Sequence, residues 1–255
     1  MLFDVAGKVA LITGSTRGIG RAIAERMAEA GANVTISSRK ADACEEVAAA
    51  INARRAGKAI AHAASISDRA ALQGLVDRTL AEWGRIDVLV CNAAVNPYYG
   101  PLLQISDDAF DKIMASNVRS NLWLCQMVIP AMAERRDGAV IVISSIAGFK
   151  GNMKLGAYGI SKAADFQLVR NLAVEWGPHN VRVNAIAPAI IRTDFARALW
   201  ENPEIYARAV ATYPLRRIGE PDEVAGAAIF LASRAGAFMT GQVLTVDGGV
   251  TIGGE

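Results

Sequence analysis

The sequence has few of the residues that metal sites, disulfide frameworks and histidine-based catalytic triads require. It contains only two histidines, His62 and His179, and three cysteines, Cys44, Cys91 and Cys125. The cysteines are far apart, lack metal-ligand spacing and are odd in number, which is typical of reduced thiols in a cytoplasmic protein. A Ser-His-Asp triad or a histidine-based metal site is therefore not expected, and we predict no metal ligands.

A strong charge imbalance and long apolar runs are also missing. The formal net charge is +2, and no block of five or more basic residues suggests a nucleic-acid partner. No apolar run reaches the roughly 18 residues that a membrane helix needs. The N-terminus shows no charged-then-apolar signal, and the final TIGGE carries no peroxisomal or retention signal. These absences predict a soluble cytoplasmic protein without a nucleic-acid or membrane partner.

The chain does contain a regular alternation of strand-like apolar runs and helical patterns. Strands are expected at 8–13, 33–38, 59–64, 85–91, 138–145, 181–188 and 243–249. Helices are expected at 19–31, 42–55, 68–82, 107–134, 157–176 and 221–232, the fourth being interrupted near Asn117. Repeated strand–helix units of this kind predict an α/β fold, a single Rossmann-type doubly wound parallel seven-stranded sheet with helices on both faces.

No composition break divides the chain, so residues 1–255 are expected to form one domain. The segment 192–217 departs from the strand–helix alternation because it is polar, rich in arginine and interrupted by prolines. Long insertions in compact domains are often lids, and we predict that 192–217 is a substrate-binding lid.

The first expected strand ends in a glycine-rich loop, TGSTRGIG at 13–20. Glycines between a strand and a helix let a dinucleotide pyrophosphate rest on backbone N–H groups at the helix start. The spacing is wider than G-x-G-x-x-G, and an ordinary tight turn is the alternative. The strand before it and the helix after it favour cofactor binding. The residues predicted to bind the cofactor here are Gly14, Ser15, Thr16, Arg17, Gly18, Ile19 and Gly20.

The stretch GAYGISK at 156–162 places Tyr158 and Lys162 four residues apart, which is one face of a helix. A phenol with its ordinary pKa of about 10 is a slow acid at neutral pH, and a nearby cation favours its ionised form. The pair is therefore interpreted as a proton donor and the charge that tunes it. The alternative is that Tyr158 covers a core and Lys162 lies along the surface.

With these motifs the chain resembles the short-chain dehydrogenase/reductase family from Gly7 to Gly249. The glycine loop matches the family's motif, and Asn117, Ser145, Tyr158 and Lys162 fall at the spacings of its catalytic Asn, Ser, Tyr and Lys. The resemblance implies nicotinamide chemistry.

The same resemblance assigns a role to each residue of the tetrad. Tyr158 is implied to be the acid, and Lys162 is also implied to bind the nicotinamide ribose. Ser145 would hold the substrate oxygen, although only family spacing distinguishes it from its neighbour Ser144. Asn117 would hold a relay water through its backbone carbonyl, and a capping residue without a catalytic part is the alternative.

The end of the second expected strand bears on the choice of nicotinamide cofactor. An acidic residue there would hold the ribose 2′-OH of NAD, whereas basic residues suit the 2′-phosphate of NADP. The chain reads ISSRK at 36–40, where Ser38 and Arg39 can donate to a phosphate, and Arg17 adds a second guanidinium. Both arginines could instead be solvated surface charges. The missing acid predicts that NADP(H) is preferred over NAD(H).

The family resemblance implies further cofactor contacts at three strand ends. They are expected at Ser65 and Ile66, at Asn92 and Ala93, and at Pro188, Ile191 and Thr193. The chain departs from the family pattern at Ser65, Cys91, Ala94 and Ala189, where the family often has Asp, Asn, Gly and Gly.

The segments CNAAVNPYYG, SSRK and TDFARALW are most similar to the peroxisomal-type carbonyl reductases of the family. This similarity implies NADPH-dependent reduction of a ketone or aldehyde, or the reverse oxidation of a secondary alcohol. Substrate contacts are expected from Asn96, Ser145, Met153 and Phe195, with Tyr98, Ile146, Leu155 and Leu199 as further candidates. They suggest an apolar or aromatic substrate, unless they only pack the core.

Two alternative functions stay open at this point. One is reduction of a 3-oxoacyl thioester, and the other is a catalytically idle NADP-binding regulator, against which the intact tetrad argues. The resemblance also implies a homotetramer, paired through the long helix that carries Tyr158 and through the C-terminal strand.

Overall fold

The structure, a computed structural model, describes residues 1–54 and 58–253. Its centre is a seven-stranded sheet of order β3-β2-β1-β4-β5-β6-β7, in which every paired strand is parallel. The strands are β1 (Val9–Thr13), β2 (Asn33–Ser37), β3 (Ala59–Ala61), β4 (Val88–Cys91), β5 (Gly138–Ile143), β6 (Val181–Pro188) and β7 (Val243–Val246). The doubly wound parallel fold expected from the sequence is confirmed.

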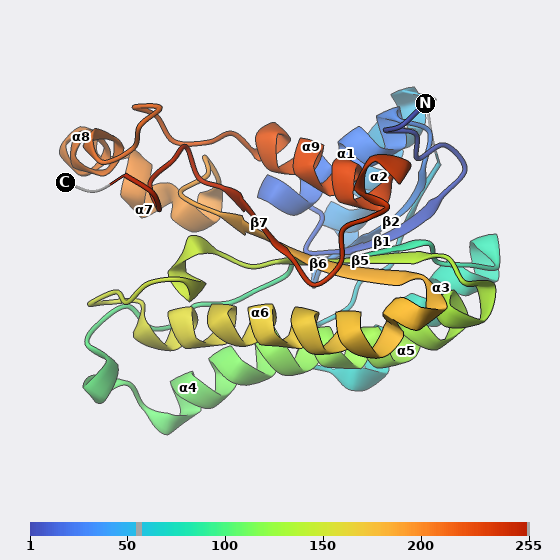
Figure 1. The fold of residues 1–255 in the computed structure, drawn as a ribbon, viewed down its shortest axis with the longest axis horizontal. Helices are drawn as coiled ribbons and strands as arrows, with labels where there is room; N and C mark the ends of the chain where they lie inside the picture. Colours follow the sequence, from blue (N-terminus) through green and yellow to red (C-terminus); the bar gives the residue numbers. More distant parts are fainter. Residues whose placement is uncertain (55–57, 254–255) are drawn as a thin grey trace.

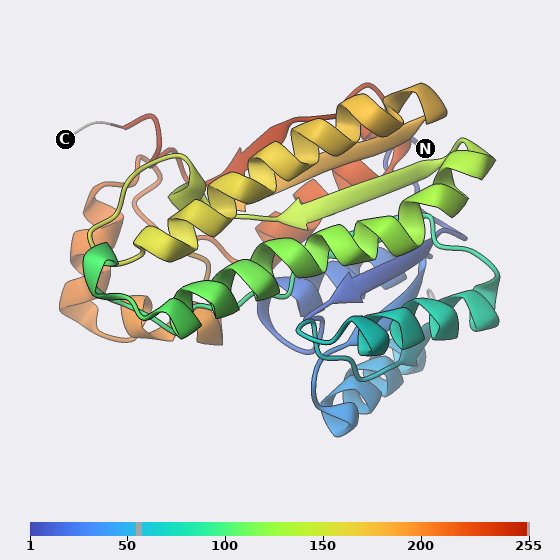
Figure 2. The ribbon, with the colours of Figure 1, turned by 90° about the horizontal axis from the view of Figure 1, so that it is seen from below.

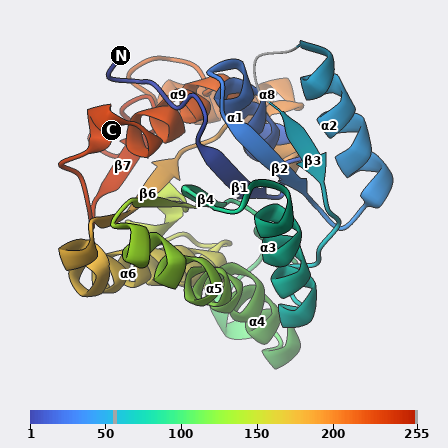
Figure 3. The same cartoon turned by 90° about the vertical axis from the view of Figure 1, so that its right-hand side faces the viewer.

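Helices connect the strands and cover both faces of the sheet (Figures 1 and 3). They are α1 (Gly18–Glu29), α2 (Ala41–Arg54), α3 (Arg69–Trp83), α4 (Asp107–Met114), α5 (Ser120–Arg135), α6 (Gly156–Trp176), α7 (Arg197–Trp200), α8 (Pro203–Ala211) and α9 (Pro221–Ala232). The helix expected over 42–55 corresponds to α2, and residue 55 lies outside the described residues. No helix among those described is long and apolar enough to cross a membrane.

Two apolar cores lie on opposite faces of the sheet because its central strands are buried on both faces. One core packs α1, α2 and α9 against the sheet, and the other packs α3, α5 and α6. Figure 3 shows these two helical layers in end view. The five residues of β1 and the six residues of β5 are all buried, as strands enclosed between two helical layers require.

Six of the strands are shorter than the sequence predicted, and β3, β4 and β7 are each shorter by three residues. Segment 85–91 forms β4 only from Val88, although Asp87 N already donates to Val9 O at 2.8 Å and Asp87 O accepts from Ala139 N at 2.9 Å. The Asp87 carboxylate turns inward and accepts a hydrogen bond from the Val9 amide at 2.9 Å. Arg85 pairs with that same carboxylate. The run 59–64 pairs only through Ala61, because β3 is the edge strand and has β2 as its single neighbour.

The interruption expected near Asn117 is a π-helical turn, Ala115–Arg119, between α4 and α5. Segment 192–217 contains a short 3₁₀ turn followed by α7 and α8. Figures 1 and 2 show α7 and α8 beyond one end of the sheet. This position suits the lid that the sequence predicts, and the lid function remains a prediction.

Candidate active site

The glycine loop between β1 and α1 is shaped for close approach of a ligand. Gly14 and Gly18 have φ of +65° and +54°, a region that side chains rarely adopt. A Cβ at Gly18 would lie 3.0 Å from Thr193 Cγ2, and one at Gly20 would lie 2.4 Å from the Gly14 carbonyl oxygen. The Arg17 side chain makes no capping hydrogen bond to the first turn of α1. The backbone amides of that turn are therefore available to an anion.

Ser15 and Asn92 hold this loop in place from below. The Ser15 hydroxyl donates to Ile12 O at 2.8 Å and accepts from Ser37 N at 2.9 Å, so its side chain joins β1 to β2. Asn92 Nδ2 donates to Thr13 O at 2.9 Å and to Gly14 O at 3.1 Å. Asn92 therefore binds the backbone of the loop, whereas the fully buried Ser15 anchors the loop to β1 and β2.

A cavity of about 700 Å³ follows the carboxyl ends of the strands above the loop. The predicted site residues that line it are Gly14, Thr16, Arg17, Gly18, Ile19, Ser38, Arg39, Ser65, Ile66, Asn92, Ala93, Tyr158, Lys162, Thr193 and Phe195. The predicted residues outside its lining are Ser15, Gly20, Asn96, Asn117, Ser145, Met153, Pro188 and Ile191. The structure thus brings the glycine loop, the end of β2 and the segments that contain Ser65, Asn92 and Thr193 together with Tyr158 and Lys162 of α6.

The cavity reaches the end of β2, where Ser38, Arg39 and Lys40 line it. Ser38 Oγ accepts a hydrogen bond from Lys40 N at 3.3 Å, which shapes the entry into α2. Among the described lining residues Asp194 is the only carboxylate, and its Oδ2 lies 3.9 Å from Arg17 Nη1. This end of the cavity therefore has an excess of basic groups.

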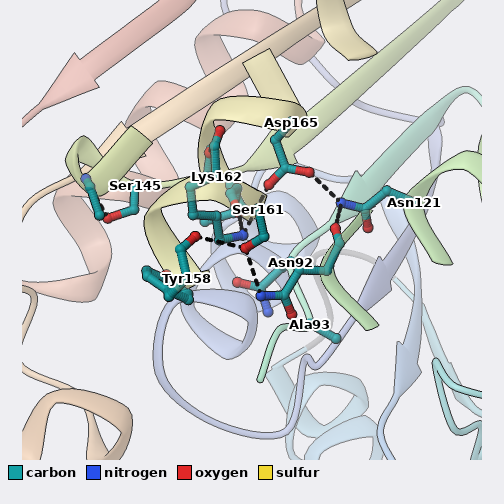
Figure 4. Close-up of polar contacts among 12 residues, drawn as sticks. Asn92, Ala93, Asn121, Ser145, Tyr158, Ser161, Lys162 and Asp165 are labelled. Atoms are coloured by element: carbon teal, nitrogen blue, oxygen red, sulfur yellow. Dashed lines mark hydrogen bonds and ion pairs between the residues drawn. The ribbon is translucent and has the colours of Figure 1, made fainter. Parts of the chain in front are cut away.

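Tyr158 and Lys162 project from one face of α6 toward the cavity (Figure 4). Lys162 Nζ lies 5.6 Å from the centroid of the Tyr158 ring. The same ammonium donates to Ile143 O at 3.1 Å and to Asp165 Oδ2 at 3.1 Å. Burial is the largest single influence on the pKa of Lys162 and lowers it, but the attraction of Asp165, its hydrogen bond and the nearby Tyr158 together raise the pKa above its ordinary value. Lys162 is therefore a buried cation beside the phenol.

Asn117 uses its whole side chain to hold neighbouring segments. Its Oδ1 accepts from Val95 N at 2.8 Å, and its Nδ2 donates to Val95 O at 3.0 Å and to Ser161 Oγ at 3.1 Å. The π-helical turn turns this side chain away from the α4–α5 axis and toward β4 and α6. These contacts give the Asn117 side chain a structural role between the segment after β4 and α6, and its catalytic role stays a prediction.

Ser144 and Ser145 differ in what their hydroxyls do. Ser144 is buried and donates to Lys162 O at 2.9 Å, which fixes the strand end to α6. Ser145 is half-buried, and its hydroxyl accepts from Ala147 N at 3.1 Å, leaving its own proton available. The contacts thus give Ser144 a structural partner and leave Ser145 with a hydrogen to donate.

The expected substrate residues are less closely gathered. The Phe195 ring lies 6.2 Å from the Tyr158 ring, so an aromatic side chain of segment 192–217 covers the phenol. Met153 is 88% exposed and does not line the cavity. Asn96 Oδ1 is buried and accepts no hydrogen bond from the described residues.

Known proteins resemble this chain over most of its length. A family model described as "Enoyl-(Acyl carrier protein) reductase" matches residues 14–251. "Dehydrogenase/reductase SDR family member 4" of Bos taurus is 40% identical over 244 residues, covering 95% of this chain and 86% of that protein. The chain belongs to the short-chain dehydrogenase/reductase (SDR) family. Its resemblance to that family is confirmed, and the chain is classed with oxidoreductases.

Solved structures extend the SDR assignment. A 7α-hydroxysteroid dehydrogenase in complex with NADH and 7-oxo glycochenodeoxycholic acid is 38% identical, with a TM-score of 0.93 and coverage of 97% of this chain and 96% of that one. A gluconate 5-dehydrogenase from Burkholderia cenocepacia J2315 in complex with NADP and tartrate is 31% identical, with a TM-score of 0.93 and coverage of 99% and 98%. These two relatives carry different nicotinamide cofactors.

A dinucleotide fits the cavity of this SDR chain on structural grounds. The left-handed Gly14 and Gly18 and the uncapped start of α1 form a cradle that added Cβ atoms would fill. The donor set is backbone amides and hydroxyls, as phosphates and ribose require. Within residues 1–54 and 58–253 no cluster of three or more potential metal ligands occurs.

Sequence reasoning missed several polar residues around this site, of which four bear on its charge. Lys112 of α4 and Asp194 line the cavity, while Asp165 and Asn121 lie behind Lys162. Asp165 carried a usable signal, because an acid three residues after Lys162 lies on the same side of a helix. Lys112 and Asn121 carried none, since their places depend on how α4 and α5 pack.

Proposed function

We propose that the chain is an NADPH-dependent carbonyl reductase that interconverts an apolar or aromatic ketone or aldehyde and the corresponding alcohol. The observation that carries this proposal is the buried Lys162 ammonium beside Tyr158 at the wall of a dinucleotide-sized cavity. A fully buried lysine is rare unless it is paired and used, and perturbed groups of this kind cluster at functional sites.

The proposed chemistry assigns one task to each side chain. When bound, the nicotinamide supplies or accepts the hydride. The Ser145 hydroxyl donates a hydrogen bond to the carbonyl oxygen of the substrate, and the Tyr158 hydroxyl gives its proton to that oxygen as negative charge develops there. The resulting phenolate is stabilised by the Lys162 ammonium. Segment 192–217, with Phe195 over Tyr158, excludes water as a lid.

The preference for NADPH rests on the end of β2. Ser38 and Arg39 offer a hydroxyl and a guanidinium where an NAD-binding site would have a carboxylate. Arg17 comes near from the glycine loop, although its pairing with Asp194 shares its charge. The basic excess at this end favours an additional phosphate.

The apolar substrate class rests on the aromatic cover of the phenol. The Phe195 and Tyr158 rings, with centroids 6.2 Å apart, both line the cavity and present aromatic surface to a substrate, and one relative's structure holds a 7-oxo steroid. The family model that matches the chain is described by an acyl-carrier reductase, so a 3-oxoacyl thioester is the second candidate.

The test is a substrate panel followed by NADPH absorbance and repeated with NADH. The panel holds an aromatic ketone, an aldehyde, an α-diketone, a 7-oxo steroid and a 3-oxoacyl thioester. Apolar ketones are expected to be the best substrates, and Tyr158→Phe is expected to lower kcat by about 10²- to 10⁴-fold with cofactor binding retained. Tyr99→Phe, at a 61% exposed residue outside the cavity lining, is the matched control.

Each contrary result has its own meaning. A Tyr158→Phe variant with more than about a tenth of wild-type kcat, with chemistry limiting, would remove Tyr158 as the acid. Preference for the thioester would support the second candidate. Binding of NADPH without turnover of any carbonyl would support a regulatory protein instead.

Assembly and location belong to the same proposal. Leu122 of α5 and Ile160 and Val174 of α6 expose 37%, 42% and 81% of their surfaces, which suits pairing of α5 and α6 between subunits of a homotetramer. Light scattering is expected to give four chains, and Val174→Glu a smaller particle. The three cysteines are free and buried, as expected for a cytoplasmic protein.

A further inference from the structure

Behind Lys162 lies a carboxylate that the proposed chemistry does not use. Asp165 is fully buried, Lys162 is 2% exposed, and Asp165 Oδ2 lies 3.1 Å from Lys162 Nζ. Both residues belong to α6, three positions apart. A buried charge without a partner is very unfavourable, so each of these two groups depends on the other for its ionised form.

Asn121 of α5 fixes this carboxylate from the other side (Figure 4). Its Nδ2 donates to Asp165 Oδ1 at 3.1 Å and to Asn117 O at 2.6 Å. Both Asp165 oxygens are therefore engaged, one by Lys162 and one by Asn121. A series of hydrogen bonds between buried residues links α6 to the π-helical turn, in the order Lys162, Asp165, Asn121 and Asn117.

The ammonium is oriented by the same contacts. An ammonium has three N–H donors. Two of them are directed to Ile143 O and to Asp165 Oδ2, both at 3.1 Å. The third remains for the side on which the cavity and Tyr158 lie. Asp165 and Ile143 thus determine both the position and the direction of the charge.

We propose that Asp165 is a positioning residue whose carboxylate is the counter-ion that keeps Lys162 protonated in a dry site and aims it at Tyr158 and the cavity. Asn121 holds the carboxylate in the ionised orientation. The catalytic consequence rests on the proposed reductase function, whereas the charge state of Lys162 does not.

The groups around Lys162 support this role. On α6 it faces Tyr158 and Asp165, and from β4 it faces Cys91. The Cys125 hydrogen bond, together with burial, raises the pKa of Cys91, so that thiol is neutral and supplies no charge. Burial raises the pKa of Asp165, and Lys162 and then Asn121 oppose that rise. Asp165 is therefore the anion that offsets the burial of Lys162.

The direct test measures the charge of Lys162 without any substrate. The protein is labelled with ¹³C at lysine Cε, and the shift of Lys162 is followed by NMR against pH, with Lys162→Met identifying the signal. In wild type the ammonium is expected to persist beyond the ordinary titration range of lysine, because the pKa of Lys162 is raised. In Asp165→Asn it is expected to lose its proton at least about two pH units lower, as buried unpaired lysines do.

Two further variants make the measurement decisive. Asp77→Asn, which changes an exposed acid of α3, is expected to leave the Lys162 titration unchanged. Asn121→Ala keeps the ion pair but loosens it, and a smaller downward shift is expected. If Asp165→Asn does not fold, Asn121→Ala decides alone. The proposal would be overturned if Lys162 titrated at the wild-type pH in Asp165→Asn or, where that variant does not fold, in Asn121→Ala.

The second readout is the pH dependence of carbonyl reduction. The ratio of Asp165→Asn to wild-type kcat is expected to fall about tenfold for each pH unit above the titration of Lys162 in the variant. A ratio that is low but constant with pH would show a packing role and refute the positioning role. If wild type reduces no carbonyl, the proposed function fails, and the NMR titration still judges Asp165.

Discussion

Replacing Arg39 by alanine tests the proposed preference for NADPH, because Arg39 lies at the cavity end where the 2′-phosphate is expected. Arg39 and Ser38 line the cavity just after β2. The one carboxylate among the described lining residues, Asp194, lies 3.9 Å from Arg17, so it is paired with Arg17 and not with Arg39. The variant should therefore weaken NADPH binding and leave NADH binding almost unchanged, because only NADPH carries the 2′-phosphate.

The size of the effect follows from one charge-assisted contact. Losing such a hydrogen bond costs about 1.5–3 kcal/mol, which corresponds to roughly ten- to a hundredfold in Kd. Arg39 is exposed, so solvent screening places the expected value near the lower end of that range. Arg17 shares its charge with Asp194, so Arg17→Ala should have a smaller effect than Arg39→Ala.

Ser38→Asp should go further and reverse the preference. The Ser38 hydroxyl already accepts from Lys40 N at 3.3 Å, and an aspartate can accept the same hydrogen bond, so the entry into α2 is preserved. The new charge repels a 2′-phosphate and accepts a hydrogen bond from a ribose hydroxyl. Like charges about 4 Å apart near a protein surface repel by up to about 4 kcal/mol, or nearly a thousandfold.

Fluorescence titration of NADPH and NADH against wild type and both variants gives the answer. Arg54→Ala, at the exposed end of α2, is the matched control and should change neither Kd. Equal weakening of both cofactors by Arg39→Ala would mean that the arginine supports the fold. Tighter binding of NADH than NADPH by wild type would refute the cofactor assignment itself.

Three other predictions use single substitutions. Ser145→Ala should lower kcat by about 10²-fold or more, well beyond Ser144→Ala, because Ser144 already donates to a backbone carbonyl; the reverse order would exclude Ser145. Gly18→Ala should weaken the binding of NADPH and NADH alike, because its Cβ would lie 3.0 Å from Thr193 Cγ2 in a left-handed conformation. Kd values equal to those of wild type would contradict the proposed cradle. Hydrogen bonds from its arginine partner lower the pKa of Glu223 to about 2, so Glu223→Gln should lower Tm at pH 7, and the difference should disappear as the pH falls from about 4.5 toward 2; a pH-independent difference would refute this linkage.

The fold could be predicted in detail because it depends on local patterns. Apolar runs such as 138–143 form strands wherever two helical layers cover them, and the glycine loop at 14–20 must turn from strand to helix. The misjudged strand ends include β3, an edge strand with a single neighbour, and β4, which begins beside a polar side chain that contacts a distant strand. Asp87 turns inward to bind Val9 N, and that contact joins residues 78 positions apart in the sequence.

The sequence by itself determined which residues carry the candidate chemistry. Helical geometry places Tyr158 and Lys162 on one face whatever the rest of the chain does, and the absence of an acid in ISSRK can be seen without coordinates. Ser15, by contrast, looks like any other member of the glycine loop until the structure shows its hydroxyl bound to β1 and β2.

Only the tertiary structure decided how the charge of Lys162 is held. Its counter-ion, Asp165, is near in sequence, but burial of the pair results from packing α6 against the sheet and α5. Asn121 reaches Asp165 across 44 residues, and the π-helical turn sends the Asn117 side chain to Val95 and Ser161. Periodicity in a sequence specifies the face of an element, whereas hydrogen bonds between elements depend on the distance and angle at which those elements pack.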